Sequence, residues 1–351
     1  MFNPKYKLTN SIVKKLTSIA EARAVIEKAK ILPQYELKLR RQAIIRMTHS
    51  STAIEGNTLL AEQIAALYAD KKVDAPERDV YEAKNYLKAL KYIDEVVKKN
   101  EPISEKVLLR LHKIVTDKTL PDNQSGHYRV RPVYVVKKRF GVIEGVVYTA
   151  PDFKKAPELC LDLIKWINES EKEEINPIVV AGIVHQEIAA IHPFADGNGR
   201  TARAMATLIL YKRGYDFRKL FALEDYYNED RPSYYEAINM GKSYKEKSDL
   251  TSWLEYFIAG FKEEIDEVKK KVSVLSSKKI DKTISSQVFL DKDQLQIIDF
   301  IDQMGRITTD DVVDILNCPK RTAQSYLQKL KKIKMIKQVG KGRASAYIME
   351  G

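Results

Sequence analysis

Two strongly apolar segments flank a short polar turn in the middle of this 351-residue chain. The first, residues 178–191, follows Asn176-Pro177, a typical helix start because a capping side chain precedes a proline at the first helical position. The second, residues 201–213, ends at Gly214, as helices often do. Helices this apolar must be buried in a core. The sequence therefore predicts a fold built around this helix pair, with the polar turn held rigidly between the two helices.

The turn brings together groups that bind polyphosphates. Residues 192–203 read His-Pro-Phe-Ala-Asp-Gly-Asn-Gly-Arg-Thr-Ala-Arg. The Gly-Asn-Gly part lies at the N-terminus of the second helix, where unpaired N–H groups and the helix dipole favour an anion. The two arginines that follow are three positions apart and so lie on nearly one face of the helix, and two guanidinium groups suit a polyphosphate. The predicted phosphate-binding residues are Gly197, Asn198, Gly199, Arg200 and Arg203.

Two further residues of the turn suggest group transfer. Asp196 is suited to hold Mg²⁺, because that ion usually takes one or two carboxylates together with substrate phosphates and waters. His192 is then the titratable group, and a neutral imidazole beside bound phosphates can take the proton of an incoming hydroxyl. A lone histidine or a lone Gly-x-Gly turn is usually structural, but this combination within one turn favours function. We predict a phosphoryl or nucleotidyl transferase.

Helical periodicity continues through most of the chain, so we predict a mainly α-helical protein. The exception is residues 132–149, where apolar residues flank a basic, glycine-containing stretch in the pattern of a β-hairpin. The Lys- and Ser-rich residues 268–287 are typical of a linker or of an exposed helix extension. Beyond it, three helical segments, the second capped by Thr308, and a Gly-Lys-Gly turn follow in the order of a winged helix-turn-helix domain. The predicted parts are an N-terminal helical region at 1–110, a catalytic domain at 111–265, a linker at 266–288 and a winged-helix-like domain at 289–351.

Composition limits the class of protein. Two cysteines, Cys160 and Cys318, lie far apart and outside any Cys-x-x-Cys spacing, so neither a disulfide framework nor a structural zinc site is indicated. The N-terminal residues form no apolar run of signal-peptide length, and the apolar residues 178–191 include a histidine and a glutamate, which argues against a membrane span. We therefore expect a cytoplasmic protein that does not enter a membrane.

Residues 192–203 match without departure the signature of the Fic (Fido-fold) family, His-Pro-Phe-x-Asp-Gly-Asn-Gly-Arg-x-x-Arg. The chain resembles that family up to about Phe261, including the hairpin and the segment Gly126-His127-Tyr128-Arg129. The resemblance implies transfer of AMP from ATP to a Ser, Thr or Tyr hydroxyl of a target protein, or of the protein itself. It also implies that His192 deprotonates the hydroxyl, that Asp196 binds Mg²⁺, and that the Gly-Asn-Gly and arginine residues hold the phosphates.

The resemblance assigns roles to two further regions. The hairpin, including Val146, Val147 and Tyr148, resembles the family's flap, which clamps the target by adding a strand to it, a mode open to any exposed strand edge. An ordinary surface hairpin would have the same sequence pattern. Tyr226 and Tyr227 lie where similar proteins contact the adenine, although tyrosines at such spacing also occur in cores.

An upstream segment, Ser51-Thr-Ala-Ile-Glu55-Gly56, resembles the family's inhibitory motif and places the chain in the class with an N-terminal inhibitory helix. There Glu55 would pair with Arg203 and remove that arginine from the γ-phosphate of ATP. The alternative is an ordinary helix end stopped by Gly56. Similar proteins also use this glutamate to position a water that removes AMP from a modified target, and the sequence does not separate addition from removal.

The C-terminal region leaves a different function open. The formal net charge is +12, and the charge is distributed unevenly along the chain. Residues 318–349 contain nine lysines or arginines and no Asp or Glu. This basic face is typical of DNA contact, so the alternative is a DNA-binding regulator with a Fic-like sensing or autoregulatory domain. The same helix-turn-helix shape also serves protein contacts. A homodimer, and transfer of UMP, phosphate or phosphocholine in place of AMP, are further alternatives.

Overall fold

The computed structural model describes residues 2–31, 33–139, 142–239, 241–246, 249–277, 290, 292–333, 335–340 and 345–350. The chain divides into two compact units. The larger comprises Met1–Lys28 and Arg40–Lys271, and the smaller comprises Ala29–Leu39 and Val272–Gly351. Most of the predicted N-terminal region and the predicted catalytic domain therefore belong to one unit.

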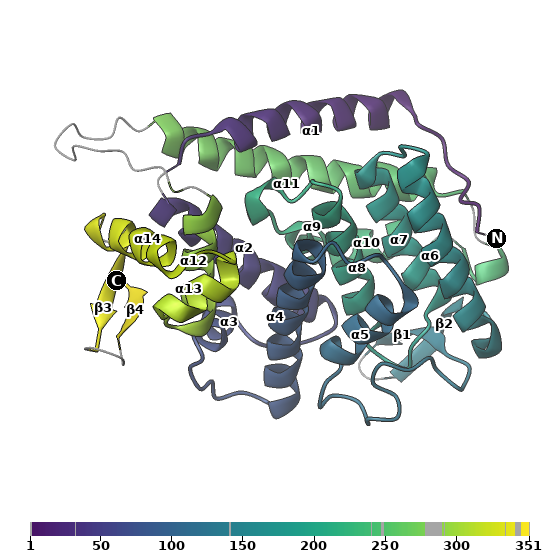
Figure 1. Ribbon diagram of the computed structural model, residues 1–351. Helices are drawn as coiled ribbons and strands as arrows, with labels where there is room; N and C mark the ends of the chain where they lie inside the picture. Colours follow the sequence, from purple (N-terminus) through teal and green to yellow (C-terminus); the bar gives the residue numbers. More distant parts are fainter. Residues whose placement is uncertain are drawn as a thin grey trace. The chain divides into compact units, whose positions relative to one another are not determined.

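Helices make up most of the larger unit, as predicted (Figure 1). Two of them also reach into the smaller unit, because α2 begins there and α11 ends there. The helices are α1 (Asn10–Lys28), α2 (Pro33–Ile54), α3 (Ala61–Tyr68), α4 (Glu77–Lys98), α5 (Glu105–Val115), α6 (Ala156–Lys172), α7 (Pro177–Ile191), α8 (Asn198–Lys212), α9 (Leu223–Glu229), α10 (Arg231–Ile238) and α11 (Thr251–Ser277).

The predicted apolar pair, α7 and α8, forms the centre of the larger unit. Asn176 caps α7 through its side-chain oxygen, which accepts from the backbone N–H of Ile178 at 2.9 Å. Nearly all side chains of both helices are buried. Helices α4 and α5 pack on α8, and α6 packs on α7. This burial fixes both ends of the polar turn.

Within the described part of the chain, no helix is long and apolar enough to cross a membrane.

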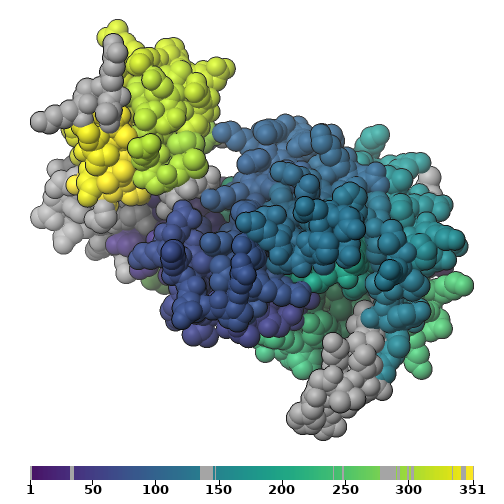
Figure 2. All heavy atoms as spheres, turned by 90° about the horizontal axis from the view of Figure 1, so that it is seen from below, coloured from purple at the N-terminus to yellow at the C-terminus, as the bar shows by residue number. Residues whose placement is uncertain are grey.

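The remaining helices of the larger unit surround this centre. The segment before α1 is bound to the start of α11, since the Thr9 hydroxyl donates to Glu255 at 2.7 Å and the Lys7 N–H donates to the Thr251 hydroxyl at 2.9 Å. Figure 1 shows α1 running alongside α11 from there. Helices α3, α4 and α5 form a continuous blue surface in the space-filling view (Figure 2).

The predicted β-hairpin is present. Strand β1 (Tyr134–Arg139) pairs antiparallel with β2 (Val142–Thr149), with register irregularities after Val135 and after Lys137. The base of the hairpin is fixed to the larger unit, because the Thr149 N–H donates to the Lys242 carbonyl at 3.0 Å. Irregular pairing of this kind bends a strand and increases its twist.

Among the described residues after 290, the smaller unit has three helices followed by a two-stranded antiparallel sheet. Thr308 caps α13, as predicted, and forms a capping box with Asp311. Ile297, Ile301 and Leu327 are among the residues of its own buried core. This order of elements is the one predicted, while the assignment as a winged helix stays a prediction. The elements are α12 (Lys292–Met304), α13 (Thr309–Leu316), α14 (Lys320–Lys332), β3 (Ile336–Val339) and β4 (Ala346–Met349).

Two predictions for the C-terminal region are only partly covered by the described residues. Residues 266–277 of the predicted linker belong to helix α11, and 278–289 lie outside the described residues. The Gly-Lys-Gly turn also lies outside them from residue 341 onward. The basic side chains of α14 are exposed, among them Lys329 and Lys331. Binding of DNA by this surface stays a prediction.

A close helix contact at Gly182 provides a test of the fold. A Cβ atom there would lie 2.9 Å from Leu254 Cδ2 and 3.0 Å from Phe257 Cδ1 of α11, and the Trp253 indole donates to the Gly182 carbonyl at 2.7 Å. We expect Gly182→Ala to lower the free energy of unfolding by about 1–3 kcal/mol through overpacking, measured by urea denaturation. An unchanged or higher stability, as helix propensity alone favours, would contradict this packing.

Candidate functional site

The turn between α7 and α8 contains two residues with left-handed backbone conformation. His192 follows α7 with φ 50° and ψ 56°, and Gly197 precedes α8 with φ 76°. A Cβ at position 197 would also lie 2.7 Å from Thr116 Cγ2, so glycine is required there. Asn198 closes the turn, since its side chain accepts from the Phe194 N–H at 2.9 Å and donates to the Phe194 carbonyl at 3.0 Å. Positive φ at a residue other than glycine is uncommon, so His192 needs such support.

His112 of α5 supports the turn from the protein interior. Its ring stacks on Phe194 with 3.7 Å between ring centroids. Nδ1 accepts from the Gly126 N–H at 2.9 Å, so Nε2 carries the proton and donates to the Asp196 carbonyl at 3.0 Å. Burial lowers the pKa of His112 to about 4. This histidine is therefore neutral at pH 7 and acts as a fixed hydrogen-bond bridge.

His192 has the tautomer that a general base requires. Its Nδ1 lies 3.2 Å from the Ala189 carbonyl, which can only accept, so Nδ1 carries the proton and Nε2 is left as an acceptor. Desolvation by the surrounding protein lowers the pKa of His192 below its usual 6.5. The imidazole is therefore neutral at pH 7 and can take up a proton at Nε2.

A cavity of about 640 Å³ lies beside His192. This volume is typical of small-molecule sites. The lining comes from the residue after α2, the end of β2, α7, the turn, α8, α10 and the residue that follows α10. The residues are Glu55, Tyr148, Gln186, Ala189, Ala190, His192, Asn198, Gly199, Arg203, Tyr234, Tyr235, Glu236, Ile238 and Asn239.

The segment predicted to be inhibitory, residues 51–56, meets the turn in this cavity. Arg203, whose side chain is 1% exposed, donates to Glu55 Oε1 at 2.7 Å, to the Ser51 hydroxyl at 2.9 Å and to the Ser51 carbonyl at 2.8 Å. Burial opposes the charge of Arg203, but the Glu55 carboxylate and its neighbours raise the pKa of the guanidinium overall. A Cβ on Gly199 would overlap Glu55 Oε1. The Glu55 carboxylate thus lies over the first turn of α8, where an anion would bind.

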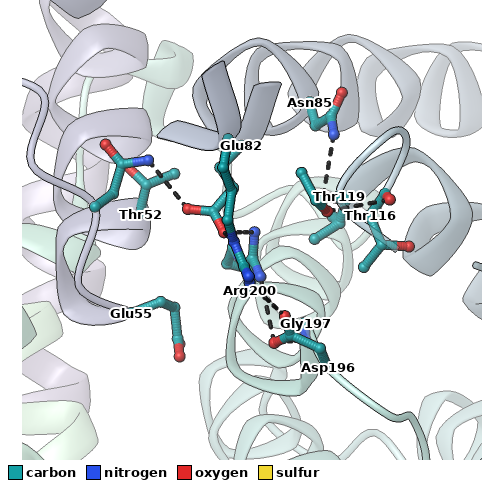
Figure 3. A network of polar contacts seen from close by, with 12 residues as sticks. Thr52, Glu55, Glu82, Asn85, Thr116, Thr119, Asp196, Gly197 and Arg200 are labelled. Atoms are coloured by element: carbon teal, nitrogen blue, oxygen red, sulfur yellow. Dashed lines mark hydrogen bonds and ion pairs between the residues drawn. The ribbon is translucent and has the colours of Figure 1, made fainter. Parts of the chain in front are cut away.

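A second charged network lies on the other side of α8 (Figure 3). The Arg200 side chain, also 1% exposed, pairs with Glu82 of α4 at 3.2 Å and with Asp196 at 3.5 Å. Glu82 also accepts from the Asn57 amide at 3.0 Å. Arg78 connects both carboxylates, donating to Glu82 at 3.1 Å and to Asp196 at 2.8 Å. The segment after the inhibitory motif is therefore connected to the residue predicted to hold Mg²⁺.

Asp196 has the chemistry of a magnesium ligand. Its side chain is 38% exposed, and one carboxylate suffices for Mg²⁺ when substrate phosphates and waters complete the coordination. In the described part of the chain, no group of three or more His, Cys, Asp or Glu side chains is arranged for a metal ion. The donor set thus fits a metal that arrives with a nucleotide, and Mg²⁺ binding stays a prediction.

Sequence comparison identifies the domain that contains this site. The model of the Fic/DOC family matches residues 102–210, which include the whole turn. These residues form a Fic domain. Curated relatives include the protein adenylyltransferase Fic of Nematostella vectensis, 29% identical over 215 residues, and the protein adenylyltransferase fic-1 of Caenorhabditis elegans, 30% identical over 183 residues. The alignments cover 59% and 51% of this chain but only 46% and 34% of those relatives.

Solved structures show the same fold. A Fic family protein from Desulfovibrio desulfuricans G20 aligns with a TM-score of 0.63 and 24% identity, over 100% of this chain and 99% of that one. A Fic domain containing signalling protein from Bacteroides thetaiotaomicron aligns with a TM-score of 0.61 and 19% identity, over 76% of this chain and 100% of that one. At these identities the likeness concerns the fold alone.

The structure brings most predicted residues of the Fic domain together, but not all. His192, Asn198, Gly199 and Arg203 line the cavity with Glu55. Gly197 and Arg200 are buried and do not belong to its lining, and Asp196 lies next to them. Of the hairpin residues, Val146 is 57% exposed, Tyr148 lines the cavity and donates to the Ala190 carbonyl at 2.9 Å, and the side chain of Val147 lies outside the described set.

The predicted adenine contacts are not at the cavity. Tyr227 is 1% exposed and stacks on Tyr234, and Tyr226 packs against Gly260 and Tyr256. Tyr234 and the adjacent Tyr235 line the cavity in place of this pair. Both pairs are Tyr-Tyr dipeptides within short helices, so the local sequence pattern does not distinguish them. Tertiary packing places the second pair at the cavity.

Three supporting residues of the Fic domain and its surroundings were not predicted from the sequence. Glu82 and Arg78 occupy a helix whose periodicity indicates only a packed amphipathic element. Tyr235 donates to the Ile54 carbonyl at 2.9 Å and so fixes the end of the inhibitory helix. The available signal was weak: Glu82 is an acidic residue within an otherwise apolar stripe of α4, flanked by Ala83.

Glu82 has a measurable structural effect. We expect Glu82→Gln to lower the free energy of unfolding by roughly 3 kcal/mol, because the buried Arg200 loses the nearer and more buried of its two charged partners. Glu95→Gln, an exposed change on the same helix, should stay within about 0.5 kcal/mol of wild type. Chemical denaturation of the three proteins measures both effects, and equal values for the two variants would show that the Glu82 ion pair contributes little.

Proposed function

We propose that this protein is a nucleotidyltransferase that transfers AMP from ATP to a Ser, Thr or Tyr hydroxyl of a protein, and that Glu55 restrains it. The observation that carries the proposal is the arrangement in one cavity of a neutral histidine, a helix N-terminus and a buried arginine held by a carboxylate. The curated relatives, named protein adenylyltransferases, support the type of reaction.

In the proposed reaction His192 Nε2 accepts the proton of the target hydroxyl. The hydroxyl oxygen forms a bond to the α-phosphorus of ATP, the bond from that phosphorus to the bridging oxygen breaks, and pyrophosphate leaves. The N–H groups at the start of α8 stabilise the charge that develops on the phosphate oxygens. Asp196 would hold Mg²⁺, which neutralises phosphate charge when bound. Transfer thus needs positioning and charge stabilisation, both supplied by one turn.

The restraint follows from competition for Arg203. Its guanidinium donates to Glu55 and to Ser51, so fewer donors remain for a phosphate. The Glu55 carboxylate also lies over Gly199, where a phosphate oxygen would accept from the helix N-terminus. ATP would therefore bind with its phosphates misplaced for transfer. Because Glu55 lines the cavity with His192, the proposal includes a second activity in which Glu55 positions a water that removes AMP from a modified target.

Labelling with ATP that carries ³²P at the α-phosphate tests the transfer. With Mg²⁺ present, we expect strong labelling of the protein itself in Glu55→Gly, weak labelling in wild type, and none in a Glu55→Gly protein that also carries His192→Ala. Glu62→Gly, an exposed change nearby, should label like wild type. If label came from γ-labelled ATP but not from α-labelled ATP, the transferred group would be phosphate and not AMP. No labelling in Glu55→Gly, with ATP binding intact, would contradict self-modification.

The pH dependence of transfer tests the role of His192. The base is active when neutral, so the rate should rise with pH through the pKa of His192 and then level off. Desolvation lowers this pKa below 6.5, and Glu55→Gly removes a carboxylate that raises it. We therefore expect the midpoint of the acid limb in Glu55→Gly to lie below pH 6.5 in rate measurements at saturating ATP. A midpoint above 6.5 would indicate a different base or an exposed imidazole.

A further inference from the structure

Arg129 contacts both the residues that flank the hairpin and the residue that follows α7. It is 4% exposed, and its guanidinium donates to three backbone carbonyls. Nε donates to the His192 carbonyl at 2.8 Å, and the two terminal nitrogens donate to the Arg131 carbonyl at 3.0 Å and the Pro151 carbonyl at 2.5 Å. Its own backbone N–H donates to the Pro193 carbonyl at 2.9 Å.

The three carbonyls belong to the two ends of the hairpin and to His192. Arg131 precedes β1 and Pro151 follows β2, so two of the bonds hold the two ends of the hairpin. The third holds the carbonyl of His192, a residue whose left-handed backbone needs support. One rigid, planar group thus connects both ends of the hairpin to the backbone of the predicted base.

The charge of Arg129 also acts on His192. Desolvation is the main cause of the lowered pKa of His192, and the positive charge of Arg129 lowers it further. Glu55, directly after α2, and Asp196 of the turn act in the opposite direction. Burying an arginine costs desolvation free energy. An apolar residue at this position would pack without that cost, so packing alone does not explain the arginine. Arg129 therefore acts on His192 in two ways, through the hydrogen bond from Nε to the His192 carbonyl and through its positive charge.

We propose that Arg129 is a positioning residue that couples the β1–β2 hairpin to His192, so that a target segment bound along the hairpin is held in register with the imidazole. The inference rests on the proposed function for the identity of His192 as the base. Lysine would keep the charge of Arg129 but lacks the planar fork needed to bind three carbonyls, and glutamine would lose both.

The test uses the full-length Glu55→Gly protein carrying Arg129→Lys, Arg129→Gln or the control Arg213→Lys. Arg213 also donates to a backbone carbonyl, that of Ile167 at 2.6 Å, but lies at the far end of α8. For Arg129→Lys we expect kcat for AMP transfer to fall roughly 10- to 100-fold, with the affinity for a fluorescent ATP analogue unchanged. In Arg129→Gln the acid limb of the pH–rate profile should also move to higher pH, because a positive charge near His192 is lost. Arg213→Lys should leave both unchanged.

Two measurements do not need activity. Nuclear magnetic resonance of ¹⁵N-labelled histidine resolves the five histidines of the chain, and the pKa of His192 should rise in Arg129→Gln. Amide hydrogen exchange should become faster in both the hairpin and residues 192–194 in each Arg129 variant. If the Glu55→Gly parent transfers no AMP but these changes occur, the proposed function fails and the coupling stands.

Three results would overturn the coupling. The first is an unchanged kcat in Arg129→Lys and Arg129→Gln. The second is a parallel loss of ATP affinity and kcat, which would indicate general disruption of the site. The third is unfolding of both variants while Arg213→Lys stays folded, which would make Arg129 a structural residue.

Discussion

Two arginines in the first two turns of α8 are buried almost completely, and this constraint organises the structure around them. A buried guanidinium without a partner is strongly unfavourable, so neighbouring elements must supply carboxylates. Glu55, directly after helix α2, pairs with Arg203, and Glu82 of helix α4 pairs with Arg200. The positions of α2 and α4 against α8 are therefore set by charge as well as by apolar packing. In the proposed function, Arg203 binds a polyphosphate correctly only when Glu55 no longer occupies it.

The two ion pairs differ in their exposure to the cavity. Arg200 is enclosed by Glu82 and Asp196 and lies outside the cavity lining, so it holds the turn in place. Arg203 faces the cavity, and its partner Glu55 is 31% exposed and comes from a different segment of the chain. A ligand can compete with Glu55 for Arg203 more readily than with Glu82 for Arg200. In the proposed function the first pair is thus structural and the second regulatory.

The sequence predicted what depends on short-range patterns. The apolar helices, the cap of Asn176 and the hairpin all follow from local periodicity or capping rules, and the structure contains each of them. Contacts between distant segments were harder to predict. Glu82 precedes Arg200 by more than a hundred residues, and no local rule connects them. Tyr234 and Tyr235 line the cavity and Tyr226 and Tyr227 do not, a difference that depends on tertiary packing and that spacing does not reveal.

The ends of the inhibitory segment are both anchored, which limits how Glu55 can leave. Arg46 binds Glu264 at 3.0 Å before the motif, and Asn57 binds Glu82 at 3.0 Å after it. Rotation of the Glu55 side chain about its own bonds is therefore the smallest movement that would free Arg203, and helix α2 can keep its place. Side-chain rotations are much faster than displacements of whole helices. If Glu55 restrains the enzyme as proposed, release would be a rapid equilibrium, and the fraction of released molecules would vary smoothly with the concentration of the anion that competes for Arg203.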